Sequence, residues 1–232
     1  MSQAKLFGSR LSPFVEKVAR ALDLKRIPFE MVSPNGPRDF AKWNPQTGKM
    51  PVLEIGGQRL YDSTFILRDL DRRHPDPPLF SAEATAAAQQ RMLEDWSDEA
   101  LYWYVMALRW TDDNRRASAK QVLDTLPKYI AAVARLFLPR QLRRSTLAQG
   151  LGRLPHEVAL RELGERMDDL VRILAAKPFF YGDRPSAADL AIYGQLNTLC
   201  SGPTPEGARQ IHARSALVEW MRRVEAATKP SG

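Results

Sequence analysis

A chain of 232 residues that is 44% hydrophobic and 26% charged has the composition of a globular protein with a real core. The formal net charge of +7 would suit nucleic acid or an acidic membrane as partner, but acidic residues are interleaved with the basic ones, so we interpret the excess as a solvated surface. The single cysteine, Cys200, excludes an internal disulfide framework and a multi-cysteine metal site. The three histidines show no ligand spacing, and we expect no bound metal.

Targeting and nucleic-acid signals are also weak in this sequence. The N-terminus lacks the apolar core of a signal peptide, and no run approaches eighteen apolar residues, so we expect a cytoplasmic protein without a membrane span. The densest basic cluster, near 135–153, has Phe137 as its single aromatic residue. Because nucleic-acid sites interleave basic and aromatic side chains, we expect no nucleic-acid partner.

The first eighty residues alternate short strand-like and helical patterns. We expect strands near 4–7 and 28–32 and helices near 13–24, 37–43 and 63–73. Two further strands, 52–55 and 59–61, flank Gly56-Gly57, which is a signal for a tight hairpin. The order is βαβ followed by ββα.

The best domain boundary is the proline-rich stretch that begins at His74, because prolines at 75, 77 and 78 stop any helix. Beyond it, helical patterns dominate, and 139–155 reads as an extended connection. The expected helices lie at 82–110, 113–137, 155–177, 186–199 and 214–228. We therefore predict an α/β N-terminal domain over 1–74, a linker over 75–81 and an all-α C-terminal domain over 82–232.

Ser12 stands where the first helix begins. It precedes Pro13 and a set of apolar residues at helical spacing, which are Val15, Val18, Ala19 and Leu22. A serine at the N-cap followed by proline is an ordinary helix start. A hydroxyl at that position can also help to hold an anion such as a thiolate, since a helix N-terminus carries unsatisfied amides and partial positive charge.

Four motifs, taken together in their order and spacing, resemble the cytosolic glutathione transferase superfamily, as a serine-type member. They are Ser12-Pro13-Phe14, Met50-Pro51-Val52, Asp62-Ser63 and the segment 179–189. The resemblance covers nearly the whole chain. It implies a thioredoxin-like glutathione-binding domain, a helical domain that contributes the electrophile site, and a homodimer. Within 179–189, Ser186 and Asp189 resemble the family's folding motif, and their spacing is that of a capping box.

The same resemblance implies how glutathione would be held. Met50 would precede a cis proline, Pro51, and present its backbone to the cysteinyl part, with Phe14 also at the site. Asp62 and Ser63 would hold the γ-glutamyl end. The aspartate is shorter than the commoner glutamate or glutamine. For the glycyl carboxylate the candidates are three cations, of which we prefer the first: Lys49, Lys42 and Arg10.

The residue types at the first helix favour conjugation over thiol transfer. Ser9 and Ser12 occupy the spacing of a Cys-x-x-Cys pair, and a hydroxyl cannot form a mixed disulfide. Ser12 is thus expected to stabilise the glutathione thiolate, which attacks a small apolar electrophile; peroxide reduction and thioether cleavage start from the same thiolate. The expected electrophile site consists of Leu11, Tyr102, Trp103 and Met106. The alternative is a non-catalytic interaction or ligand-holding protein of the same fold.

Overall fold

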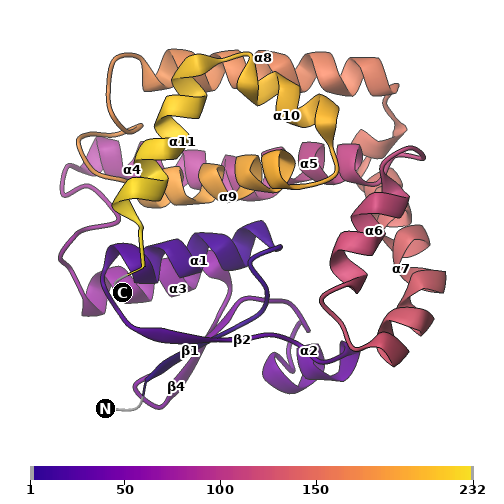
Figure 1. Cartoon of the computed structure of the whole chain (residues 1–232). Helices are drawn as coiled ribbons and strands as arrows, with labels where there is room; N and C mark the ends of the chain where they lie inside the picture. The colour runs from indigo at the N-terminus through magenta and orange to yellow at the C-terminus, as the bar shows by residue number, and fades with distance from the viewer. Residues whose placement is uncertain (1–2, 231–232) are drawn as a thin grey trace.

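The computed structural model describes residues 3–230, and its N-terminal part contains a sheet (Figure 1). The sheet has four strands in the order β2-β1-β3-β4. Strands β1 and β2 are parallel, whereas the β1/β3 and β3/β4 pairs are antiparallel. The elements of this part are β1 (Ala4–Phe7), α1 (Pro13–Leu24), β2 (Phe29–Val32), α2 (Pro37–Trp43), β3 (Val52–Ile55), β4 (Gln58–Tyr61) and α3 (Ser63–Arg73). The predicted βαβ and ββα order is confirmed, and with it the thioredoxin-like first half.

Alternation along the strands explains why helices cover both faces of the sheet. Leu6 and Leu53 point into the main core with the buried side of α1, which lies on the same face as α3 (Figure 1). Phe7 and Val52 point the other way and pack with Trp43 of α2, whose ring centroid lies 5.0 Å from that of Phe7. The predicted hairpin is present, with φ of 59° at Gly56 and 77° at Gly57, and glycine meets this requirement without steric cost.

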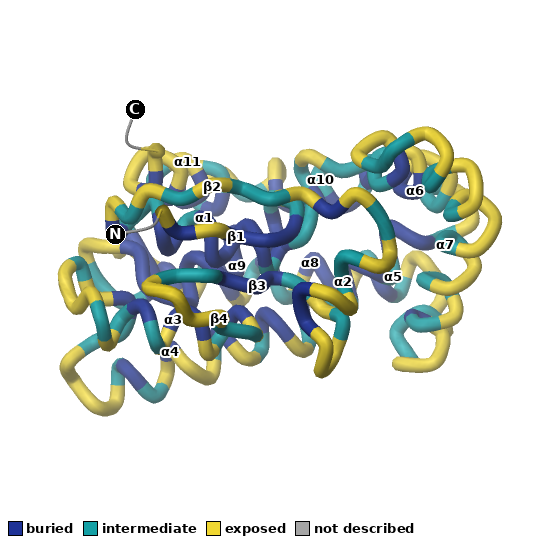
Figure 2. The backbone as a smooth tube through the Cα atoms, turned by 90° about the horizontal axis from the view of Figure 1, so that it is seen from below, coloured by how far each residue is buried: buried dark blue, intermediate teal, exposed yellow. Residues whose placement is uncertain are grey.

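The second half is helical and wraps around α9, which is buried over most of its length (Figure 2). Helix α9 contacts α1, α4, α5, α10 and α11, so it joins the two halves of the molecule. The elements are α4 (Ala84–Trp96), the π-helical turn η1 (Ser97–Leu101), α5 (Tyr102–Arg109), α6 (Arg115–Leu123), α7 (Lys128–Gln149), the 3-10 turn η2 (Leu151–Arg153), α8 (His156–Leu174), α9 (Ala187–Ser201), α10 (Pro205–His212) and α11 (Ser215–Ala227).

The prediction of an extended connection over 139–155 is wrong, because α7 runs through Pro139 to Gln149. The residues of α7 that pack against Trp110 and Leu123 recur at helical spacing, and they are Ala131, Ala134, Leu138 and Leu142. This periodic contact outweighs the hydrogen bond that proline removes. The break falls earlier, between α6 and α7, so the single helix expected over 113–137 is two helices.

Two other helix predictions need correction. The continuous helix expected over 82–110 is interrupted by the π-helical turn Ser97–Leu101. Helix α10 was not predicted, because Gly202, Pro203 and Gly207 are typical of a loop, although Pro205 stands at the first helical position, where proline is favoured.

The Ser186–Asp189 pair anchors the start of α9 in the core. Asp189 Oδ2 accepts from Ser186 N at 2.8 Å and from Ser186 Oγ at 2.7 Å, while Oδ1 accepts from Trp220 Nε1 at 2.8 Å and Phe180 N at 3.1 Å. Burial raises the pKa of Asp189, and these donors oppose that effect. The four hydrogen bonds hold α9, α11 and the loop before α9 together.

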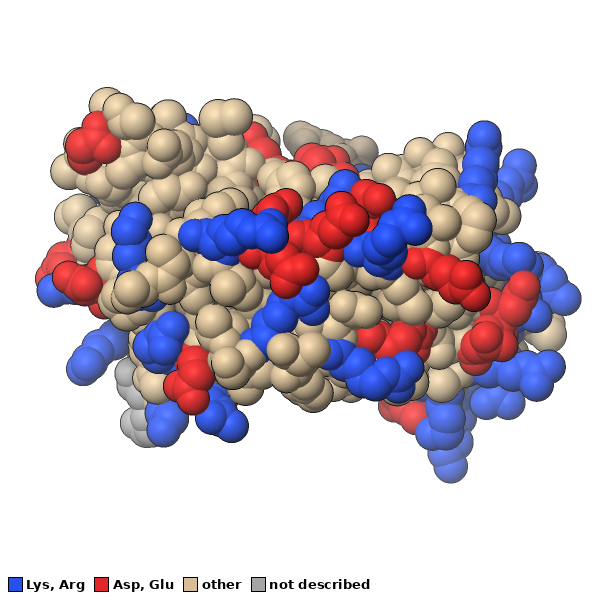
Figure 3. Space-filling view, turned by 90° about the horizontal axis from the view of Figure 1, so that it is seen from above, with Lys and Arg blue, Asp and Glu red and all other residues tan. Residues whose placement is uncertain are grey.

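The surface carries basic and acidic side chains side by side, as the interleaved charges of the sequence predict. Lys and Arg side chains lie beside Asp and Glu side chains on the face seen in Figure 3. Within residues 3–230, no helix is long and apolar enough to cross a membrane. The same residues contain no group of three or more His, Cys, Asp or Glu side chains that could hold a metal ion.

Candidate functional site

Ser12 lies at the N-cap of α1 with an extended backbone conformation, φ −85° and ψ 124°. Its backbone N donates to Ser9 O at 2.9 Å, which shapes the loop that precedes the helix. Its side chain makes no capping hydrogen bond, and its residue is half-buried. The hydroxyl at the N-terminus of this twelve-residue helix is therefore not used by the helix itself.

The loop around Met50 and Pro51 lies against the end of β1. The Met50–Pro51 peptide bond is cis, as the resemblance predicted. A β-carbon on Gly8 would lie 3.5 Å from Met50 Cβ and only 2.6 Å from Val15 Cγ2, so glycine permits this close approach. The β1–α1 loop and the Met50–Pro51 loop are therefore neighbours.

An aromatic contact joins α1 to α5 of the helical part of the chain. The ring centroid of Phe14 lies 5.0 Å from that of Tyr102, and Tyr102 lies 5.2 Å from Trp103. Burial raises the pKa of the Tyr102 hydroxyl. Three of the predicted site residues thus lie in one aromatic row that starts beside Ser12.

The other two residues predicted for the electrophile site differ in how deeply they are buried. Leu11 is half-buried in the β1–α1 loop, where its backbone N donates to Ser9 Oγ at 3.3 Å. Met106 is buried in an apolar cluster with Trp110 and Leu123, beneath α6. Its side chain is core of the α5–α6–α7 packing, so Tyr102 and Trp103 are the more accessible members.

Asp62 and Ser63 form the start of α3. Asp62 is exposed, has a φ of 68°, and accepts hydrogen bonds from Thr64 N at 2.9 Å and Phe65 N at 3.3 Å through Oδ1. Ser63 is buried, and its Oγ accepts from Lys17 Nζ at 3.4 Å. The pair therefore combines a carboxylate at the surface with a hydroxyl directed toward a buried lysine.

Lys17 is the centre of a buried charge cluster that the sequence analysis missed. Its side chain has 0% exposure, and its Nζ lies 2.6 Å from Glu94 Oε1 and 2.7 Å from Asp98 Oδ2. Burial alone would lower the pKa of Lys17, but the two carboxylates outweigh burial and raise it. Glu94 and Asp98 have the i,i+4 spacing of one helix face, but nothing in the sequence connects that pair to Lys17.

This cluster holds one positive and two negative groups, so it carries an excess of negative charge beside the start of α3. Among the residues that the structure describes, Asp98 Oδ1 and Glu94 Oε2 are buried without a hydrogen-bond partner. Burial raises the pKa of Asp98, Lys17 opposes this, and repulsion from Glu94 and Asp62 adds to it. A cation bound next to Asp62 would relieve that repulsion.

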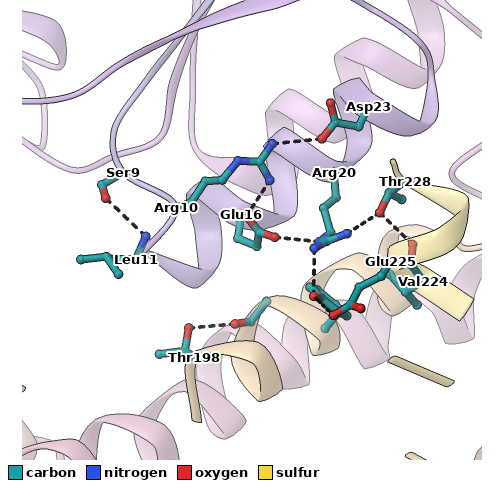
Figure 4. Close-up of polar contacts among 12 residues, drawn as sticks. Ser9, Arg10, Leu11, Glu16, Arg20, Asp23, Thr198, Val224, Glu225 and Thr228 are labelled. Atoms are coloured by element: carbon teal, nitrogen blue, oxygen red, sulfur yellow. Dashed lines mark hydrogen bonds and ion pairs between the residues drawn. The ribbon is translucent and has the colours of Figure 1, made fainter. Parts of the chain in front are cut away.

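The three cations considered for the glycyl carboxylate differ in their contacts and in their exposure. Arg10 is turned back along α1, where it donates to Glu16 at 2.8 Å and Asp23 at 3.0 Å (Figure 4). Lys42 and Lys49 are exposed. Lys49 directly precedes the cis peptide bond, and its carbonyl accepts from Asn44 Nδ2 at 2.9 Å, which fixes its backbone.

The sequence matches family models of two domains. Residues 6–78 match the glutathione S-transferase N-terminal domain, and residues 164–224 match the C-terminal domain. A probable glutathione transferase of Aplysia californica is 30% identical over 86 residues, which are 36% of this chain and 92% of that protein. Glutathione transferase GST 23 of Zea mays is 33% identical over 132 residues, 53% of this chain and 59% of that protein. The matches to the first curated relatives span 32% to 59% of their lengths.

Solved structures resemble this chain over almost its whole length. A glutathione S-transferase of Rhodospirillum rubrum F11 superposes with a TM-score of 0.71 at 22% identity, covering 98% of this chain and 91% of the other. A glutathione S-transferase of Methylobacterium radiotolerans, solved with glutathione sulfonate, gives a TM-score of 0.63 at 26% identity, covering 97% and 91%. With a thioredoxin-like first half, a helical second half and family matches in both, the chain belongs to the glutathione S-transferase family.

Proposed function

We propose that this protein is a glutathione transferase in which Ser12 stabilises the thiolate of bound glutathione for attack on an apolar electrophile. The observation that carries the proposal is the Ser12 hydroxyl, which stands at the N-terminus of α1 and takes no part in capping it. In the reaction the sulfur forms a bond to the electrophilic carbon, the leaving group departs with its electron pair, and the thiol proton goes to solvent.

The energy required of Ser12 is modest. A thiol with a pKa of about 8.5 is roughly 3% ionised at pH 7, and lowering that pKa by about two units needs about 2.7 kcal/mol. A hydrogen bond from a hydroxyl to a charged acceptor contributes about 1.5–3 kcal/mol. The helix N-terminus adds about 0.3–1 kcal/mol for a nearby anion. The sum of these two ranges includes the free energy that the pKa shift requires.

The γ-glutamyl end of glutathione would bind at Asp62 and Ser63. Its carboxylate would accept from the N–H and the hydroxyl of Ser63, because the next two amides of α3 already donate to Asp62 Oδ1. Its ammonium would face Asp62, with the excess negative charge of Asp98 behind. The cysteinyl backbone would pair with Met50, and Lys49 would hold the glycyl carboxylate. The proximity of Gly8 to Met50 and of Lys17 to both Ser63 and Asp98 supports this arrangement.

The electrophile would bind between Leu11 and the aromatic pair Tyr102 and Trp103, with Phe14 at the same surface. Met106 would act through packing, since it is buried beneath α6. Conjugation is the reaction that we favour. The contact between Phe14 and Tyr102 supports a site at which both halves of the chain meet. The proposed domains are residues 1–74 and 82–232, joined by a linker over 75–81.

The test is a calorimetric titration of glutathione into the wild-type protein and the Ser12→Ala variant, followed by an assay with a generic aromatic halide. We expect glutathione to bind both proteins, with turnover lost only in the variant. If the wild type fails to bind glutathione, the enzyme proposal is wrong and a non-catalytic protein of the same fold takes its place.

We also propose a homodimer that forms through α3 and α4. Phe65 on α3 is 63% exposed and Met92 on α4 is 73% exposed, and Thr64 Oγ1 donates to Glu94 Oε1 at 3.0 Å between the same two helices. Large exposed apolar side chains on adjoining helices are typical of protein interfaces. Phe65→Asp is expected to shift the mass measured by light scattering from dimer to monomer, whereas Tyr129→Asp, on exposed α7, is expected to leave it unchanged. A monomeric wild-type protein would contradict this proposal.

A further inference from the structure

Arg109, the last residue of α5, is a buried cation without an acidic partner. It is 6% exposed, and its Nη2 donates to Gln121 Oε1 at 2.8 Å. Among the described residues, its Nε is buried without a hydrogen-bond partner, and it forms no ion pair with a carboxylate within 4.0 Å. The other buried cations differ: Lys17 has Glu94 and Asp98, and Lys25 lies 2.9 Å from Asp71.

An unpaired buried charge is costly to a fold. Taking a guanidinium out of water without an opposite charge costs several kcal/mol, and for this reason buried charges are almost always paired. Burial lowers the pKa of Arg109, in agreement with its lack of a carboxylate neighbour. Gln121 satisfies one of the five N–H donors that a guanidinium carries. The remaining capacity suits a ligand that brings an anion.

The spacing along α5 relates Arg109 to Tyr102 of the proposed electrophile site. Arg109 follows Tyr102 by seven residues, which is about two helical turns, so the two side chains share one face of α5. Helical side chains tend to lean toward the N-terminus of their helix, which for Arg109 is the direction of Tyr102. The positive charge of Arg109 lowers the pKa of the Tyr102 hydroxyl, against the larger effect of burial, which raises it.

We propose that Arg109 binds a carboxylate on the second substrate, with the Tyr102 hydroxyl as an additional donor. The electrophile is then an apolar, flat compound that carries a carboxylate at the end remote from the reacting carbon. The aromatic row of Phe14, Tyr102 and Trp103 contacts its body, and Arg109 contacts its anionic end. This inference rests on the proposed function, because it describes the same site.

The test uses ligands that bind without reacting. Binding of S-methylglutathione, S-benzylglutathione and S-(4-carboxybenzyl)glutathione is measured by calorimetry in the wild type and in Arg109→Met. We expect the wild type to bind the carboxybenzyl compound about tenfold or more tightly than the benzyl compound, which is the ratio for a charge-assisted hydrogen bond. In Arg109→Met this preference is expected to fall to within about twofold, while the affinity for S-benzylglutathione changes less than about threefold.

Two further variants and a salt test separate recognition by Arg109 from a general effect of charge. Arg116→Met removes an exposed arginine of α6 and is expected to keep the preference. Arg109→Lys keeps the charge without the planar fork and is expected to retain part of it. The wild-type preference is also expected to persist in about 0.5 M salt, since buried pairs are screened less than surface charges.

Failure of S-methylglutathione to bind would overturn the proposed function, and this inference with it. If S-methylglutathione binds but the wild type has no preference for the carboxybenzyl compound, the inference alone is overturned, and that result needs no folded variant. An equal loss of affinity for the benzyl and carboxybenzyl compounds in Arg109→Met would also overturn it, because it would indicate a packing role.

Discussion

Lys17 Nζ and Asp98 Oδ2, which are 81 positions apart in the chain, lie 2.7 Å from each other and tie α1 to the π-helical turn of the second half. Two other contacts cross the same boundary. Phe14 lies against Tyr102, and a β-carbon on Gly194 would lie 2.5 Å from Pro13 O, so α9 approaches the start of α1 closely. The helix that carries Ser12 is therefore held on several sides by the helical half.

Replacing the buried lysine is expected to destabilise the fold. Lys17→Met leaves Glu94 and Asp98 buried without a counter-ion, and the expected loss is about 3–5 kcal/mol of unfolding free energy at pH 7. Burial already raises the pKa of Asp98, so the folded variant binds more protons than the unfolded chain, and its stability should recover as pH falls. Urea denaturation at pH 7 and pH 5 measures this.

The control for that experiment is Lys5→Met, since Lys5 is exposed and lies 3.9 Å from Glu30 on the sheet surface. Its expected effect is below about 1 kcal/mol at both pH values. A Lys17→Met variant as stable as this control would show that the buried cluster contributes nothing to the fold.

Asp98 is expected to affect glutathione affinity more than stability. In Asp98→Asn, Glu94 still pairs with Lys17, so the loss of unfolding free energy should stay below about 2 kcal/mol. The negative charge behind Asp62 disappears, and KM for glutathione should rise about tenfold while kcat changes less than about threefold. Asp95→Asn, an exposed position on α4, is the matched control. An unchanged KM for glutathione would show that Asp98 does not contribute to glutathione binding.

Cys200 should be a poorly reactive thiol. Burial raises its pKa from 9.0 to about 11, so the thiolate is about a hundredfold scarcer than in an unfolded chain. Alkylation by iodoacetamide at pH 8 should be slower by about that factor in the native protein than in urea, and should rise about tenfold for each pH unit up to about 11. Cys200→Ser should retain conjugation. Equal rates in the native and unfolded protein would contradict the shift.

Local sequence patterns were sufficient to predict the strands and helices of the first half of the molecule. The helix over 13–24 follows from apolar spacing after Ser12, and the hairpin follows from Gly56-Gly57, since both depend on residues close in the chain. The motif that contains Met50 and Pro51 depended on the family resemblance, because a cis bond is the less common state for proline in general.

Contacts between distant segments could not be predicted in this way. The continuation of α7 through Pro139 depends on packing against Trp110 and Leu123, which the local proline signal does not reveal. The burial of Lys17 depends on residues 77 and 81 positions away, and a lone lysine in a sequence is usually exposed. The burial of Arg109 could not be predicted either, because an arginine at a helix end is typically solvated.

In the proposed mechanism, the Ser12 hydroxyl lowers the pKa of the glutathione thiol. The most direct measurement is the ultraviolet absorbance of the bound thiolate as a function of pH in wild type, Ser12→Ala and Ser12→Thr. We expect a thiol pKa about two units below 8.5 in wild type and Ser12→Thr, and within about half a unit of 8.5 in Ser12→Ala. The same low pKa in wild type and Ser12→Ala would contradict the claim and assign the effect to the helix N-terminus alone.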